Sequence, residues 1–269
     1  MRILLVNVNT TSTMTSAITS VARRYARPGT NIVGIQPTWG PESVEGFMEG
    51  VLSAAAVIER LATFRDSFDA VVLAGYGESG REAVRELVDV PVLDVADSAA
   101  VFACQLGRRF SVVTTFDRSV PQIEESLRNA GLDGRCASVR ATGLGVLEQD
   151  EERTRRRLLE EARRAIDDDG AEVICLGCGG MAGFDKELER ELGVPVIDGV
   201  VAAVKLAESF YDYGLKTSKV TAFAARRERI RNWPRPADPA EDALRRGHSD
   251  ALLGHVPSVE RTIEMSGTR

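Results

Sequence analysis

The sequence contains very little histidine. Only His248 and His255 are present, and both lie in a polar stretch near the end of the chain. A histidine-based catalytic triad or a histidine-rich metal site needs side chains of this type within the folded core. No Walker-type lysine motif for nucleotide phosphates occurs either. The sequence therefore predicts no metal site and gives little support to nucleotide binding.

The chain also lacks an excess of positive charge and a long hydrophobic run. Its formal net charge is −6, which is the wrong sign for a surface that attracts nucleic-acid phosphates. No apolar stretch approaches the roughly 20 residues that span a bilayer. The first residues, MRILLVNVNTTS, are too polar for a secretion signal. We expect a cytoplasmic protein that binds a small molecule, and neither nucleic acid nor a membrane.

Cysteine is scarce as well. The four cysteines are Cys104, Cys136, Cys175 and Cys178, and in the cytoplasm they are expected to stay reduced. Cys175 belongs to the apolar run Val-Ile-Cys-Leu, so we predict that it packs in the core. Its spacing to Cys178 straddles a strand and a loop, unlike a redox or zinc-binding pair. We predict structural roles for all but Cys178.

Short apolar runs alternate along the chain with longer amphipathic segments, a pattern typical of βα units that build a parallel sheet. The predicted strands are Ile3–Asn7, Ile32–Gln36, Ala70–Ala74, Pro91–Val95, Phe110–Thr114, Ala137–Ala141, Val173–Leu176 and Pro195–Asp198. The predicted helices are Thr13–Tyr25, Glu49–Phe64, Gly80–Leu87, Ser98–Leu106, Val120–Asn129, Glu152–Asp167, Asp185–Glu191 and Val200–Tyr211.

The predicted elements form two sets in the same order, and the sequence repeats with them. DAVVLAGYG is followed by a V-P-V-L-D strand, and AEVICLGCGG is followed by V-P-V-I-D. This predicts an α/β fold of two similar Rossmann-like lobes, each a four-stranded parallel sheet flanked by helices. We expect residues 1–97 with 200–232 to form the first lobe and 98–199 the second. Residues 233–269 are expected to be a loosely ordered tail.

Cys178 stands at the predicted end of a strand, between glycines that let backbone N–H groups approach a ligand. A helix N-terminus favours the thiolate, so we expect the pKa of Cys178 to be lowered towards neutrality. Such a thiolate can take a proton from a carbon next to a carbonyl, while N–H and hydroxyl groups hold the enolate oxygen. A small apolar cysteine in a turn is the alternative.

Other polar residues are predicted at the same edge of the sheets, where ligands bind in open parallel sheets. Asn9 follows the first strand, and we interpret it as a substrate contact, since Thr11 or Ser12 alone could cap the next helix. Thr114 and Thr115 occupy the equivalent turn of the second half, as candidate donors to an oxyanion or carboxylate.

The segments VNVNTT, P-x-S-x-E-G at residues 41–46, RRFSVVTT, LGCGGM, VPVIDGV and AAVKLAE occur in this order. Together they resemble the hydantoin and allantoin racemases of the Asp/Glu racemase superfamily, over roughly residues 1–219. The resemblance implies a cofactor-independent isomerase, commonly oligomeric, with the substrate in the cleft between the lobes. The substrate classes are hydantoins, allantoin, amino acids and related small acids. It assigns Cys178 to catalysis and substrate contacts to Asn9, Thr114 and Thr115. We also expect substrate contacts at Thr10, Gly75, Gly179 and Gly180.

The sequence departs from the family pattern at one catalytic position. The family usually carries a second cysteine after the third strand, whereas this chain has Gly75 there, in A-G-Y-G-E-S-G. Tyr76, Glu78 or Ser79 in the same turn could supply the second proton if the surroundings adjusted their pKa. Alternatively, the single thiol could serve a cofactor-free decarboxylase of arylmalonate type, or the protein could be a ligand binder without catalysis.

Overall fold

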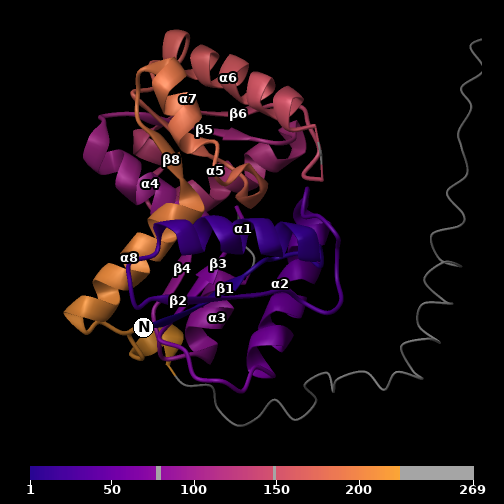
Figure 1. Ribbon diagram of the computed structural model, residues 1–269, viewed down its shortest axis with the longest axis vertical. Helices are drawn as coiled ribbons and strands as arrows, with labels where there is room; N and C mark the ends of the chain where they lie inside the picture. The colour runs from indigo at the N-terminus through magenta and orange to yellow at the C-terminus, as the bar shows by residue number, and fades with distance from the viewer. Residues whose placement is uncertain (77–79, 148–149, 225–269) are drawn as a thin grey trace, which may run out of the picture. The chain divides into compact units, whose positions relative to one another are not determined.

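The protein is described from a computed structural model that covers residues 1–76, 80–147 and 150–224 in detail. Strands and helices alternate along these residues (Figure 1). The strands are β1 (Arg2–Val6), β2 (Asn31–Ile35), β3 (Ala70–Leu73), β4 (Val92–Asp94), β5 (Phe110–Thr114), β6 (Cys136–Ala141), β7 (Val173–Leu176) and β8 (Val196–Asp198). The α-helices are α1 (Ser12–Tyr25), α2 (Phe47–Ala62), α3 (Arg81–Leu87), α4 (Val95–Leu106), α5 (Val120–Asn129), α6 (Glu151–Asp167), α7 (Asp185–Leu192) and α8 (Gly199–Tyr213). All predicted elements are present, and the predicted tail at 233–269 lies outside the described residues.

The strands form two four-stranded sheets, in the orders β2-β1-β3-β4 and β6-β5-β7-β8. All their pairings are parallel. The second order repeats the first with every strand number raised by four, as expected for a duplicated unit. The predicted fold class, with two similar α/β halves, is confirmed.

Helices cover both faces of each sheet (Figure 1). Along β1, Ile3 and Leu5 pack with residues of α1 and α8, whereas Leu4 and Val6 pack on the other face with residues of α2 and α3. The second sheet lies between α6 and α7 on one face and α4 and α5 on the other. Because strand side chains alternate between faces, four apolar residues in a row can be buried on both sides.

The repeated V-P-V-[LI]-D motif has a structural reason in each half. Asp94 and Asp198 are the last residues of β4 and β8, and each is also the N-cap of the helix that follows. The side chain of Asp94 accepts a hydrogen bond from Asp97 N, and that of Asp198 accepts from Val200 N. An N-cap aspartate satisfies amides that the helix leaves free. The aspartate therefore ends the strand and starts the helix in both halves.

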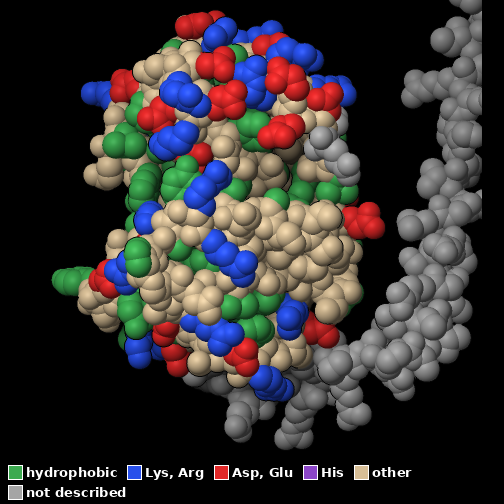
Figure 2. All heavy atoms as spheres, viewed as in Figure 1, with side chains coloured by type: hydrophobic (Ala, Val, Ile, Leu, Met, Phe, Trp, Pro, Cys, Tyr) green, Lys and Arg blue, Asp and Glu red, His purple; other side chains and the backbone are tan. Residues whose placement is uncertain are grey.

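Charged side chains gather over α6 and α7, whereas the exposed side of the first turns of α1 shows few of them (Figure 2). The exposed residues there are Ser12, Thr13, Ser16 and Ala17. None of the helices in the described part of the chain is long and apolar enough to cross a membrane. The uncharged surface of α1 adjoins the site described next.

Candidate functional site

A small cavity of about 40 Å³ lies at the carboxyl ends of four strands. These are β1 and β3 of one sheet and β5 and β7 of the other, the central pair of each sheet. At such a pair, successive connections leave in opposite directions and open a crevice for ligands. We call it the thiol cavity. Residues lining it at these strand ends are Asn9, Gly75, Tyr76, Thr114, Thr115 and Cys178.

Cys178 is half-buried and begins the short 3₁₀ turn Gly179–Met181. Burial raises the pKa of its thiol above the ordinary value, and the nearby charge of Glu45 adds to this effect, while a hydrogen bond with the Gly180 backbone opposes it. The sequence-based expectation of a lowered pKa is therefore wrong. A turn of three residues provides little dipole to offset the desolvation of a thiolate.

Glycines on both sides of Cys178 allow its loop to lie close to neighbouring strands. A Cβ on Gly177 would come within 2.7 Å of Val112 Cγ1 and 2.9 Å of Val113 O. A Cβ on Gly179 would come within 3.0 Å of Ala74 O, at the end of β3 in the other sheet. Gly180 has more room, since its nearest neighbours would be 3.6 Å away or more. The first two glycines are therefore required by packing.

Asn9 is buried, and its side chain has two different environments. Its Oδ1 accepts hydrogen bonds from Asn7 Nδ2 at 2.9 Å and from Thr11 N at 3.0 Å. Its Nδ2 donates to the sulfur of Met14 at 3.3 Å. A thioether is a weak acceptor, so the amide hydrogens of Asn9 remain available to a better one. Thr11 is the N-cap of α1, but its hydroxyl donates to Glu42 O instead of capping the helix.

Thr114 and Thr115 are both buried, but only one hydroxyl is committed. Thr114 Oγ1 donates to Gly177 O at 3.0 Å and so ties the end of β5 to the loop of Cys178. The Thr115 hydroxyl makes no hydrogen bond with the described residues. Thr10 and Gly180 do not line the thiol cavity; they line a larger, open hollow beside it.

Gly75 and Cys178 occupy equivalent positions in the two halves. Gly75 lies two residues beyond Leu73, the last residue of β3, and Cys178 lies two residues beyond Leu176, the last residue of β7. Both line the thiol cavity. The position in the first half that matches the thiol therefore carries no side chain.

Tyr76, one of the candidates to supply the second proton, is a weaker acid than a free phenol. Its ring packs against the buried clusters of both halves, and its hydroxyl is buried without a hydrogen-bond partner among the described residues. Burial raises the pKa of Tyr76 well above its ordinary value. The phenol therefore keeps its proton at neutral pH. Glu78 and Ser79, the other two candidates, lie outside the described residues.

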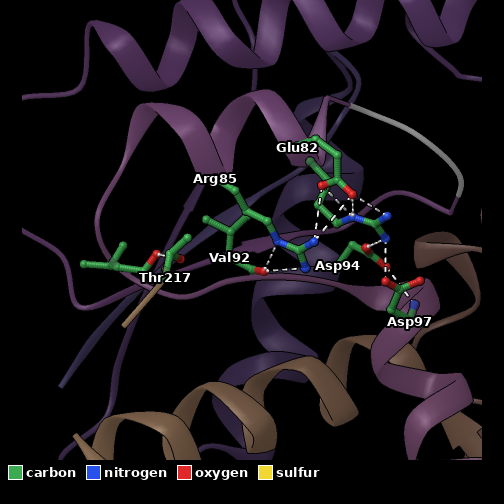
Figure 3. A network of polar contacts seen from close by, with 8 residues as sticks. Glu82, Arg85, Val92, Asp94, Asp97 and Thr217 are labelled. Carbon is green, nitrogen blue, oxygen red and sulfur yellow. Dashed lines mark hydrogen bonds and ion pairs between the residues drawn. The ribbon is translucent and has the colours of Figure 1, made fainter. Parts of the chain in front are cut away.

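A buried ionic network fixes the start of α3, directly after this loop (Figure 3). Arg81 Nη1 contacts Asp94 Oδ2 and Asp97 Oδ2, each at 2.5 Å. Glu82 also binds Arg81, and Arg85 binds Glu82 and the carbonyl of Val92. Burial and the charge of Asp94 raise the pKa of Asp97 to about 6, although Arg81 opposes this. The network anchors the end of the Gly75 loop to β4 and α4.

Several residues that line the thiol cavity were not predicted. Ser119 and Gln122 come from the start of α5, and Val44 and Val146 come from loops. Val44 lies within the P-x-S-x-E-G segment at residues 41–46, and this motif was the sequence signal that could have identified it. Met14 is the second residue of a predicted amphipathic helix, where an apolar side chain is typical of an ordinary core contact.

None of the other three cysteines lines the thiol cavity. Cys175 is fully buried in β7, and burial raises its pKa well above the ordinary value. Cys136 lies in β6, and burial raises its pKa to about 11. All four cysteines are free thiols. Among the described residues, no group of three or more His, Cys, Asp or Glu side chains could hold a metal ion.

Comparison with known proteins identifies the family. The model of the family Asp/Glu/hydantoin racemase matches residues 3–207. The chain belongs to this family. It is 43% identical over 226 residues to a hydantoin racemase of Pseudomonas sp. (strain NS671), covering 83% of this chain and 91% of that protein.

Two solved structures of allantoin racemases resemble this Asp/Glu/hydantoin racemase family member over most of its length. The enzyme of Pseudomonas fluorescens is 53% identical with a TM-score of 0.83, covering 84% of this chain and 97% of that one. The enzyme of Klebsiella pneumoniae is 39% identical with a TM-score of 0.82, covering 85% and 94%. An arylmalonate decarboxylase, 20% identical with a TM-score of 0.55 and covering 80% and 94%, shares the fold alone.

Proposed function

We propose that the protein is a cofactor-independent racemase that inverts a carbon next to a carbonyl in a small cyclic ureide, a 5-substituted hydantoin or allantoin. The observation that carries the proposal is the convergence of Cys178, Asn9 and Thr115 on one cavity at the ends of the central strands. Membership of the racemase family and the 53% identity to an allantoin racemase support it.

Cys178 transfers the proton in this reaction. Its thiolate removes the hydrogen of the carbon, and the electron pair of the C–H bond moves onto the neighbouring carbonyl to form an enolate. The Thr115 hydroxyl makes no hydrogen bond with the described residues, and the Asn9 amide donates only to the weakly accepting Met14 sulfur, so both can donate to the enolate oxygen. The Gly180 backbone, which already bonds the sulfur, stabilises the thiolate.

The opposite face of the enolate lies towards Gly75, which offers no acid. The proton is returned there by a water molecule, because a glycine leaves space beside that face of the planar intermediate. Water is a less well placed acid than a fixed thiol. Exchange of the hydrogen with solvent on the Cys178 face is therefore faster than inversion.

The decarboxylase that Gly75 suggested is not favoured, since arylmalonate decarboxylase is far less similar to this chain than the allantoin racemases are.

The test is to incubate the protein in deuterated water with single enantiomers of 5-substituted hydantoins and of allantoin, and to subtract the spontaneous reaction. For the enantiomer whose hydrogen faces Cys178, we expect deuterium to enter faster than optical activity is lost. Carbon dioxide release from a disubstituted malonate would favour the decarboxylase, and no exchange with any compound would favour a non-catalytic binder.

The pH profile follows from the raised pKa of Cys178. A raised pKa means that the neutral thiol persists to higher pH, and each unit below the pKa reduces the thiolate about tenfold. We expect kcat/KM for exchange to rise about tenfold per pH unit between roughly pH 6.5 and 8.5. A flat profile over this range, measured after subtraction of the uncatalysed rate, would contradict the thiolate base.

We also propose that the protein is a cytoplasmic homo-oligomer that pairs through an exposed apolar patch on α2. Phe47, Met48, Val51 and Leu52 are 57%, 69%, 71% and 43% exposed. Their spacing places them on one side of the helix, and such patches mark interaction surfaces. Light scattering after gel filtration should show that Val51→Glu reduces the molecular mass, while Leu106→Glu, at an exposed residue of α4, does not. An unchanged mass for Val51→Glu would rule out this interface.

A further inference from the structure

Met14, like Val146 and Gly179, lines two neighbouring hollows. Met14 lies in the first turn of α1 and is half-buried. It lines the thiol cavity, and it also lines an open hollow of about 680 Å³ on the α1 side. We call the second hollow the outer basin. Its lining combines hydroxyl and apolar side chains, among them Thr10, Thr13, Ala17, Ile18 and Leu147.

The thiol cavity is too small for the proposed substrate. Its volume of about 40 Å³ is close to the roughly 30 Å³ that a single water molecule, with one heavy atom, takes up in the liquid. A hydantoin ring with its two carbonyl oxygens contains more heavy atoms than that. A wall of the cavity has to move before such a ring can reach the sulfur of Cys178.

Met14 is the wall that can move most easily. The backbone around Gly177 and Gly179 is held at close contact with its neighbours, as the 2.7 Å and 3.0 Å approaches of an added Cβ indicate. Methionine is unbranched, with three rotatable bonds and a soft sulfur. A Cβ on Gly180 would lie 3.6 Å from Met14 Cε and 3.7 Å from Cys178 Sγ. The methyl group and the thiol therefore flank the same glycine.

Met14 also accepts a hydrogen bond from the Asn9 amide, the donor that we propose for the substrate carbonyl. Asn9 Nδ2 donates to the Met14 sulfur at 3.3 Å, while the other end of this amide is held by Asn7 and Thr11. A carbonyl oxygen is a stronger acceptor than a thioether. When a substrate carbonyl replaces the Met14 sulfur as the acceptor of the Asn9 amide, the position of Met14 away from Asn9 becomes favoured.

We propose that Met14 is a movable gate that also determines specificity. When it swings aside, the substrate carbonyl takes over the Asn9 amide, the ring carbon reaches Cys178, and the 5-substituent extends into the outer basin. Met14 acts on binding and access and takes no part in proton transfer. The substrate class in this statement rests on the proposed function; the gate itself rests on the two hollows and the Asn9 contact.

The gate is tested without any turnover by alkylating the full-length protein. Iodoacetamide and the bulkier N-phenylmaleimide are compared at one pH, and the label on Cys178 is followed by peptide mass spectrometry. Met14→Ala should speed labelling by N-phenylmaleimide about tenfold, with a smaller effect on iodoacetamide, because the open fraction of the site rises. Leu106→Ala, which shortens an apolar side chain on α4, should leave both rates unchanged.

A second variant, Met14→Ile, is expected to slow labelling, which a loss of stability would not do. Met14→Ile is stiff at its branched Cβ and should slow labelling of Cys178 by N-phenylmaleimide below the wild-type rate. Circular dichroism melts show whether each variant is folded. Equal labelling rates in folded wild type, Met14→Ala and Met14→Ile would overturn the gate.

Specificity is measured by racemisation. Met14→Ala should raise kcat/KM for 5-benzylhydantoin relative to 5-methylhydantoin about tenfold, mainly through KM. An unchanged ratio would overturn the specificity role. If labelling responds to Met14 but neither wild type nor variant racemises any hydantoin or allantoin, the gate stands and the proposed function fails.

Discussion

Replacing Cys178 with serine is expected to lower kcat/KM for hydrogen exchange and racemisation by about 10²- to 10⁴-fold, the usual contribution of a positioned acid or base. A serine hydroxyl fits the same space but is far too weak an acid to supply an oxyanion at neutral pH. Polarimetry and deuterium uptake with the best substrate of the hydantoin and allantoin panel would measure the loss.

The matched control is Cys104→Ser, because Cys104 is another half-buried free thiol, and it does not line the thiol cavity. This variant should keep the wild-type rate. If Cys178→Ser were folded and exchanged hydrogen at the wild-type rate, Cys178 would not be the base, although the family membership would be unaffected.

Replacing Gly75 with cysteine is expected to raise the rate of inversion about tenfold and to bring it close to the rate of exchange. Gly75 is equivalent to Cys178 in the other half and lines the same cavity. A thiol there would stand opposite Cys178 and would replace water as the acid on the second face. The ratio of inversion to exchange, measured in deuterated water, is the decisive quantity.

Gly75→Ser is the control for this variant, since it adds a side chain of similar size without an acid of useful pKa. It should fill the space next to the substrate and fail to increase inversion. A folded Gly75→Cys enzyme whose inversion-to-exchange ratio equals that of the wild type would contradict the opposed arrangement of the two positions.

The fold was predictable because the pattern of each element is local. All the strands and helices were predicted within three residues of their observed ends. The largest difference is at α4, which begins at Val95 and was predicted from Ser98. Asp94 caps this helix directly from the end of β4, so no loop separates the two elements. The aspartate of the repeated V-P-V-[LI]-D motif is a signal for a helix start, but the proline and valines before it predict only a strand.

The sequence predicted which strand-end loops form the site, but it did not predict the packing and pKa of the side chains within it. The strand ends carrying Asn9, Thr114, Thr115 and Cys178 do meet at one cavity. The pKa of Cys178 was predicted in the wrong direction, because desolvation depends on contacts that the sequence does not reveal. The same limit applies to Met14, whose position between two hollows depends on how α1 packs against the second half.

The two equivalent loops carry different residues, Cys178 and Gly75, and thermodynamics limits how this difference can affect the kinetics of the two enantiomers. Mirror-image substrates have equal free energies in solution, so a racemase must have the same kcat/KM in both directions, however unlike its two sides are. In the kinetics of racemisation, a sulfur on one side and a glycine on the other therefore affect kcat and KM separately, and not their ratio. We expect one enantiomer to bind more tightly and turn over more slowly, by the same factor, than its mirror image.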